Sequence, residues 1–152
     1  MKKIANKMVI AGLMIACISL FSFKNIPGGD SFQVYLNGKL VLDKALYKYK
    51  EIQNLELPQV SANDKVEISY SHCGVTGKSR TITARDAQGK VLKTWHFADS
   101  DQRKMSIRLQ DLKELQSNNK KSSISLYYSS KELTVGQQLV SVSVGNKSLA
   151  AR

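Results

Sequence analysis

After residue 31 the chain is a succession of short runs in which apolar and polar residues alternate, with turn-forming residues between the runs. Alternation of period two places one face of a strand in a core and the other in solvent. No stretch in this region has the longer period of an amphipathic helix, so we expect no helix of more than a turn or two. The pattern predicts an all-β fold: a single antiparallel β-sandwich, Ig-like or jelly-roll-like, of about eight short strands. A barrel is the alternative.

Two hairpins are indicated by their turn residues. Asn37-Gly38 lies between two alternating runs, and this pair favours a type I′ turn, in which both central residues take a positive φ. The four residues Asp86–Gly89 lie between two further alternating runs. Each turn predicts antiparallel pairing of the strands on either side of it.

The remaining runs predict further elements. Further strands are expected at 65–71, 79–85, 90–97, 105–109, 122–128 and 138–144. Residues 44–57 fit a strand or a bent edge segment, and Leu133 with Val135 indicates a short edge strand. Residues 111–115 predict a single helical turn. Trp95 shares a face with apolar neighbours, which predicts that it lies in the core.

The N-terminal residues have the pattern of an export signal. Residues 8–23 carry no charge and follow three lysines. This arrangement is typical of a secretory signal peptide, and the run is shorter than the roughly 20 residues of a membrane-spanning helix. We expect a signal peptide at 1–22, a flexible leader at 23–31, a β-sandwich domain at 32–145 and a disordered tail at 146–152. The protein is then exported to the periplasm, the cell surface or the extracellular space of a bacterium, with no membrane span in the mature chain. An uncleaved anchor and lipidation at Cys17 are the alternatives.

The chain is strongly basic, with 23 Lys and Arg against 12 Asp and Glu. Loss of the three lysines of the signal leaves 20 basic and 12 acidic residues, a net charge of +8. This charge favours an anionic glycan or surface ligand, or an unidentified protein, as partner. The lysines are scattered and form no basic stripe with interleaved aromatic residues, so we do not expect nucleic-acid binding.

Rare residue types gather between residues 70 and 97. This segment contains both histidines, the single tryptophan and the one cysteine beyond the apolar N-terminal run. The candidates for a binding site are His72, Cys73, Lys78, Arg80 and His96. We expect the thiol of Cys73 to be buried at a strand end, because an unpaired cysteine packs as a small hydrophobe.

No motif in this segment indicates a catalytic residue, a metal ligand set or a cofactor. Residues 74–79 resemble a phosphate-binding loop, but His72 stands where that motif requires glycine, and a strand follows instead of a helix. The sequence therefore predicts a small exported, non-catalytic β-sandwich that serves as a binding or accessory interaction module. One alternative is a structural or assembly protein that pairs through an edge strand. The other is a metal- or thiol-based site formed by His72, Cys73 and His96.

Overall fold

Nine strands and one helix make up the part of the chain that the computed structural model describes. The described residues are 29–46, 51–57, 61, 63–100, 102–120 and 123–145. The predicted signal peptide and tail lie outside them, as does the leader up to residue 28. The elements are β1 (Ser31–Leu36), β2 (Lys39–Ala45), β3 (Gln53–Leu57), β4 (Lys65–Ser71), β5 (Thr81–Arg85), β6 (Val91–His96), β7 (Lys104–Arg108), α2 (Leu109–Asn118), β8 (Ile124–Ser129) and β9 (Gln137–Val144).

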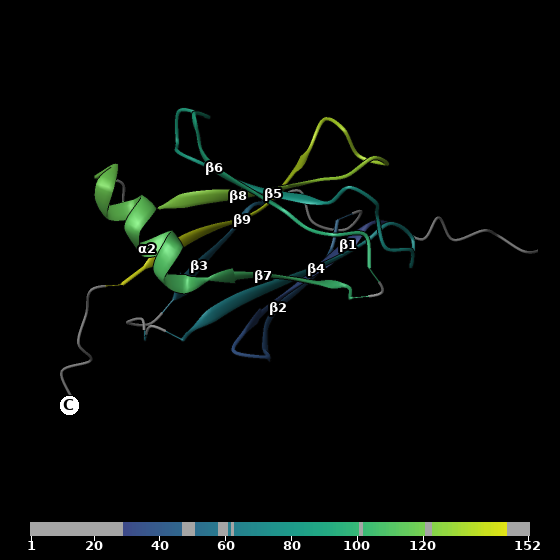
Figure 1. Cartoon of the computed structure of the whole chain (residues 1–152), viewed down its shortest axis with the longest axis horizontal. Coiled ribbons are helices and arrows are strands. Elements are labelled where there is room, and N and C mark those ends of the chain that lie inside the picture. The colour runs from purple at the N-terminus through teal and green to yellow at the C-terminus, as the bar shows by residue number, and fades with distance from the viewer. Residues whose placement is uncertain are drawn as a thin grey trace, which may run out of the picture.

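The strands form two packed sheets, which confirms the predicted β-sandwich; the sheets do not close into a barrel (Figure 1). One sheet has four strands in the order β2-β1-β4-β7, and all its pairs are antiparallel. The other has five strands in the order β3-β9-β8-β5-β6. Its β3–β9 pair is parallel and the other pairs are antiparallel, so this sheet is mixed.

The core lies between the sheets and follows the predicted alternation. On β4 the side chains of Val66, Ile68 and Tyr70 are buried, and the matching positions of β8 are buried too. The last strand contributes Val140 and Val142 from the same face. Each such residue stabilises the fold by about 1.5–3 kcal/mol relative to an exposed position. The inward faces of these strands are therefore as predicted.

Both predicted hairpins are present. Asn37 and Gly38 have φ values of 50° and 81°, as a type I′ turn requires, and they join β1 to β2. The turn between β5 and β6 is closed by Asp86, whose Oδ1 accepts hydrogen bonds from the backbone N–H groups of Gln88 and Lys90. The outer strand of each hairpin contains a bulge: the register shifts opposite Val34/Tyr35 in β2 and opposite Ala84/Arg85 in β6.

Three expectations are wrong. The helical turn at 111–115 is part of the ten-residue helix α2, because Leu109 and Leu112 anchor its first turns in the core and Leu115 packs against the core. Leu133 and Val135 lie in the loop between β8 and β9 and form no edge strand. Trp95 is only partly buried, since β6 is the outer strand of its sheet, although its ring packs against the core.

The connections fall at two ends of the sandwich. Helix α2 follows β7 and contacts β9, β4 and β7 at one end (Figure 1). The loops 72–80, 97–103 and 130–136 lie at the other end. The described ranges contain one helix, α2, and it is not long and apolar enough to cross a membrane.

Candidate binding site at one end of the sandwich

Strand register brings three loops together at the end of the sandwich away from α2, which we call the loop end. Thr81 at the start of β5 is paired with His96 at the end of β6 and with Ser129 at the end of β8. Lys104 at the start of β7 is paired with Ser69 near the end of β4. The loops 72–80, 97–103 and 130–136 therefore begin or end at adjacent strand termini.

Arg80 holds the loop 97–103 in place from beneath. Its side chain is 2% exposed. One terminal nitrogen, Nη1, donates to the carbonyl oxygens of Gln102 (2.9 Å) and Arg103 (3.3 Å), and Nη2 donates to that of Ala98 (2.8 Å). Among the described residues the salt bridges do not include Arg80, and its terminal nitrogens are bound by backbone carbonyl groups. Arg80 is thus buried, with its guanidinium directed at the backbone of this loop, and its role in ligand binding stays a prediction.

Carboxylates at either side fix the loop 72–80. Asp99 accepts a 2.6 Å hydrogen bond from the backbone N–H of Ser79, a residue with a positive φ of 51°. Glu132 accepts one of 3.0 Å from the N–H of Lys78. The hydrogen bond from Lys78 N–H, together with others in its loop, lowers the pKa of the Glu132 carboxyl. The three loops are therefore linked by directed hydrogen bonds.

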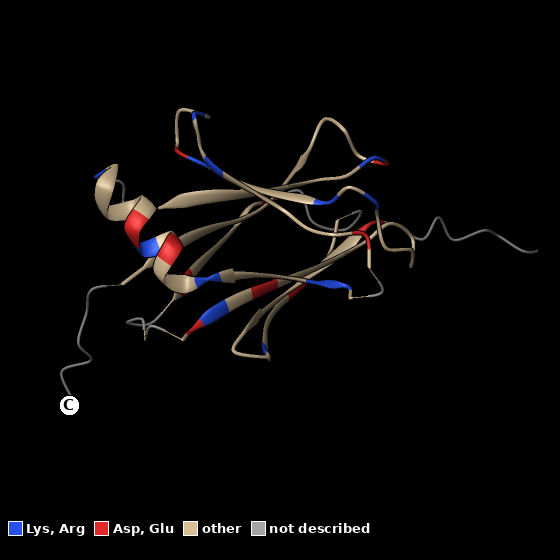
Figure 2. Cartoon of the chain, viewed as in Figure 1, with Lys and Arg blue, Asp and Glu red and all other residues tan. Residues whose placement is uncertain are grey.

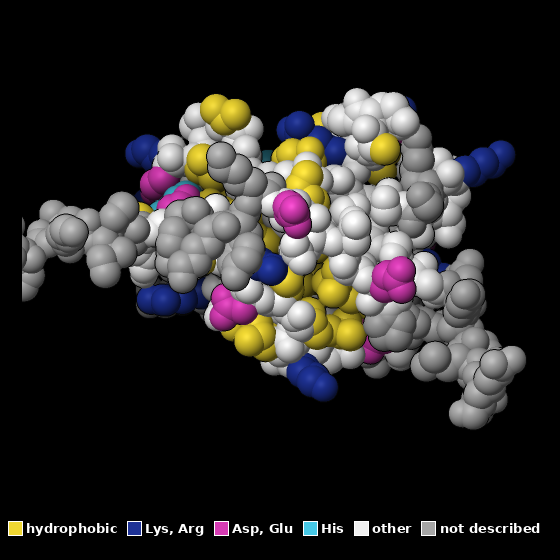
Figure 3. All heavy atoms as spheres, turned by 180° about the vertical axis from the view of Figure 1, so that it is seen from behind, with side chains coloured by type: hydrophobic (Ala, Val, Ile, Leu, Met, Phe, Trp, Pro, Cys, Tyr) yellow, Lys and Arg dark blue, Asp and Glu magenta, His cyan; other side chains and the backbone are white. Residues whose placement is uncertain are grey.

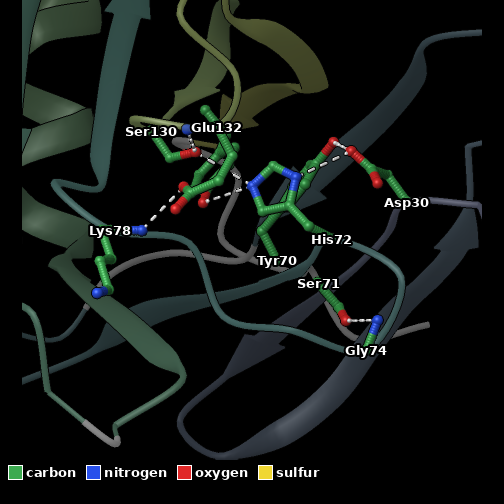
Figure 4. Close-up of polar contacts among 9 residues, drawn as sticks. Asp30, Tyr70, Ser71, His72, Gly74, Lys78, Ser130 and Glu132 are labelled. Atoms are coloured by element: carbon green, nitrogen blue, oxygen red, sulfur yellow. Dashed lines mark hydrogen bonds and ion pairs between the residues drawn. The ribbon is translucent and has the colours of Figure 1, made fainter.

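His72 lies beneath this loop and connects the two sheets (Figure 4). Its Nδ1 is 3.2 Å from Oδ2 of Asp30, which also accepts a 2.8 Å hydrogen bond from the hydroxyl of Tyr70. Its Nε2 is 3.2 Å from the hydroxyl of Tyr128 and 3.1 Å from that of Ser130. Asp30 and Tyr70 belong to the four-stranded side, whereas Tyr128 and Ser130 belong to the five-stranded side. The network therefore fastens the sheets together at the loop end.

The order Asp30–His72–Ser130 resembles the carboxylate, imidazole and hydroxyl of a serine hydrolase. The surroundings of Ser130 favour a structural role instead. Ser130 is 6% exposed, and its Oγ accepts a hydrogen bond from the N–H of Glu132. Gly77 is buried over the network so closely that a Cβ placed there meets the Tyr128 hydroxyl and His72 Nε2. A substrate has no path to the Ser130 hydroxyl while this loop is in place.

A hollow of about 420 Å³ opens on the outer side of Gly77. We call it the loop-end hollow, and it is lined by Thr76, Gly77, Lys78, Asp99, Ser100 and Arg103. A second hollow of about 430 Å³, the sheet hollow, lies over the outer face of β4 and β7 and is lined by Lys65, Glu67, Gln102, Arg103, Lys104 and Ser106. Arg103 belongs to both, so the hollows adjoin. Figure 2 shows basic segments where the chain enters β5 and β7, at this end of the molecule.

The structure separates the five predicted site residues. Lys78 lines the loop-end hollow, and His72 lies behind its floor. Cys73 is exposed, contrary to expectation, because it occupies the tip of a tight turn closed by paired backbone hydrogen bonds between His72 and Val75, where its φ is 50°. His96 is exposed and pairs with Thr81, whose hydroxyl contacts Ser129 on the outer face of the sheet.

The two histidines therefore do not share a site. His72 contacts Tyr128, which points inward from β8, while His96 lies on the opposite face of the same sheet. Across the described ranges no group of three or more His, Cys, Asp and Glu residues is arranged to hold a metal ion.

Sequence reasoning missed most of the hollow. Thr76, Ser100 and Arg103 lie in loops whose partners are distant in sequence. Asp30 stands in the predicted leader, 42 residues from His72. One local pattern indicated the turn at the start of the loop 72–80. Gly74 readily takes a positive φ, and Cys73 and Gly74 both have positive φ values.

Comparisons with protein-family models, with curated proteins and with solved structures found no match to this chain.

Proposed function

We propose that the protein is an exported, non-catalytic binding module that recognises an anionic group in the loop-end hollow. The observation that carries the proposal is the charge of the loops. Among the described residues Lys78 and Arg103 line the hollow with one carboxylate, that of Asp99, and the buried charge of Arg80 lies directly behind the loop. Cations on a fixed scaffold attract a carboxylate, sulfate or phosphate group, and Arg pairs with such groups in two-pronged geometry.

The rigidity of the hollow supports binding over catalysis. The loops on both sides are held by the Arg80 fork, by Asp99 and by Glu132. Threonine and serine hydroxyls at Thr76 and Ser100 add neutral donors beside the cations. Because the backbone of these loops is already held, binding of a ligand does not have to order the loops, which lowers the entropic cost of binding.

Pairing through an edge strand, the alternative role, has weaker support. Two of the four edge strands of the described sheets, β2 and β6, contain a bulge and carry lysines (Lys39, Lys44 and Lys93), and both features hinder the addition of a further strand there. Two apolar side chains on β2, Leu40 and Val41, are exposed. Figure 3 shows apolar atoms on the face seen from behind, broken up by polar ones, and this distribution does not favour one large interface.

Retention on a column of immobilised sulfated polysaccharide tests the proposal. The variants Lys78→Gln, Arg103→Gln and Lys39→Gln each remove one positive charge, but Lys39 lies beside the Asn37–Gly38 turn at the other end of the molecule. We expect the first two to elute at clearly lower salt than the wild type and Lys39→Gln to elute close to it. Equal shifts for all three variants mean that overall charge alone causes retention, and the proposal then fails.

A further inference from the structure

The two hollows adjoin at Arg103, and together they offer more room than a single small anion needs. Arg103 belongs to both linings, and its chain neighbours Gln102 and Lys104 line the sheet hollow. Each hollow has the size of a small-ligand site. A ligand that fills both must therefore be elongated and pass over Arg103.

The charges along the two linings are mixed, and in the sheet hollow Glu67 is paired with two lysines. The combined lining contains the cations Lys65, Lys78, Arg103 and Lys104 and the carboxylates Asp99 and Glu67. Glu67 is 8% exposed and lies 3.3 Å from Nζ of Lys65 and 3.9 Å from Nζ of Lys104. Nζ of Lys104 also lies 3.8 Å from the centroid of the Tyr35 ring. The cations of the sheet hollow are thus held in place rather than extended freely into solvent.

The neutral groups of the two linings suit a sugar chain better than a nucleic acid. Thr76, Ser100, Gln102 and Ser106 supply hydroxyl and amide groups between the cations. The two carboxylates and these neutral groups accept hydrogen bonds from the hydroxyls of a saccharide, donors that the phosphodiester linkages of a nucleic acid lack. Among the described residues, no aromatic side chain lines either hollow, and Nζ of Lys104 lies over the Tyr35 ring beside the sheet hollow. Single-stranded nucleic acids are usually held by stacking of bases on such rings.

We infer that the ligand is a linear acidic polysaccharide, one with a carboxylate on its sugar units, and that it lies across both hollows with Arg103 at the centre. This inference rests on the proposed function, because it extends the anion site in the loop-end hollow to a longer ligand. A chain that occupies both hollows binds more tightly than one sugar unit, since the second contact is made at a high effective concentration.

Calorimetry with galacturonic acid and with its linear hexamer tests the inference, using the wild type, Lys78→Gln, Lys104→Gln and Lys65→Gln. We expect the hexamer to bind the wild type at least about tenfold more tightly than the monomer. Lys78→Gln lowers the affinity for both ligands. Lys104→Gln and Lys65→Gln lower the ratio of hexamer affinity to monomer affinity, each by about fivefold to tenfold. Thermal melting of each variant identifies any loss that comes from unfolding.

The outcomes separate the two proposals. If Lys78→Gln weakens binding while Lys104→Gln and Lys65→Gln leave the ratio unchanged, the anion site stands and its extension across both hollows is wrong. If no variant changes binding of either ligand, both are wrong. An oligonucleotide of equal charge that binds as tightly as the hexamer, with the same dependence on Lys104, overturns the assignment of a polysaccharide.

Discussion

The ring of Tyr70 on β4 stacks on the ring of Tyr128 on β8, with centroids 4.0 Å apart and planes inclined by 11°. The two rings come from different sheets, so this contact bridges the sandwich directly beneath the loop end. Burial raises the pKa of both phenols, and for Tyr70 the hydrogen bond to Asp30 adds to the effect. The pair therefore links the packing of the sheets to the scaffold of the proposed site.

This contact predicts loss of stability in alkali. Tyrosine ionises near pH 10 in an unfolded chain. Because the folded-state pKa of each phenol is higher, their contribution to stability is complete below about pH 10 and declines as the pH rises above it. We expect the wild-type free energy of unfolding to fall by up to about 1.4 kcal/mol per pH unit for each of the two tyrosines. Urea titrations at pH 8–11 measure this slope, which becomes shallower in Tyr70→Phe and Tyr128→Phe. Identical slopes in all three proteins contradict the assignment.

Two glycines in one loop make a matched pair. Gly77→Ala forces a Cβ against the Tyr128 hydroxyl and the His72 ring, so we expect a loss of about 1–3 kcal/mol and an altered near-ultraviolet circular dichroism of the tyrosines. Gly74→Ala meets no atom within 4 Å and suffers only the strain of a positive φ of 93°, about 1 kcal/mol. A spectral change in Gly74→Ala but not in Gly77→Ala is the opposite of this expectation.

The buried guanidinium of Arg80 predicts two separate effects of its removal, one on stability and one on ligand binding. Arg80→Met leaves three carbonyl oxygens without their donor, which costs about 2 kcal/mol or more. The loop 97–103 then loses its anchor, so binding of the galacturonate hexamer weakens even at temperatures where the variant is fully folded. Arg103→Met, an exposed position, is the stability control and changes the free energy of unfolding by less than about 0.5 kcal/mol. Full hexamer affinity in folded Arg80→Met contradicts the anchoring role.

Asp111 predicts a separate acid transition at the helix end. Burial acts to raise the pKa of this carboxyl, but the hydrogen bond and charge of Lys93 and the charge of Arg108 outweigh it, and the net shift is downward. Its contribution is therefore complete above about pH 4, the unfolded value, and is lost as the pH falls below it. Since Lys93 and Arg108 are largely solvated, we expect Asp111→Asn to cost only about 1–2 kcal/mol at pH 7. The difference from wild type shrinks below pH 4, whereas Glu114→Gln on the exposed side of the helix has little effect at any pH. A difference that stays constant down to pH 2.5 refutes this account.

Local patterns predicted the strands because their causes are local. Asn37-Gly38 specifies its hairpin within a few residues, and the alternation of Val66, Ile68 and Tyr70 determines which face of β4 is buried. The parallel pairing of β3 with β9 joins segments more than 80 residues apart, and no local pattern indicates it.

The candidate site depended on such distant contacts. Arg80 follows a turn, and arginine is a residue type usually found at the surface. The carbonyl groups that accept its hydrogen bonds belong to Ala98, Gln102 and Arg103, about 20 residues further along the chain. Cys73 was expected to be buried because of its side chain, whereas the backbone requirement of its turn places it in solvent. Of the five candidate residues named from the sequence, only Lys78 lines a hollow. Its exposure follows from its position in a loop and needs no distant contact.

Amide chemical shifts during titration with galacturonate test the central claim most directly, because they locate binding along the chain. We predict saturable shifts at Thr76, Lys78, Ser100 and Arg103, with little change at the Asp86–Gly89 turn at the opposite end. Shifts of equal size at both ends, or shifts confined to that far turn, contradict an anion site at the loop end.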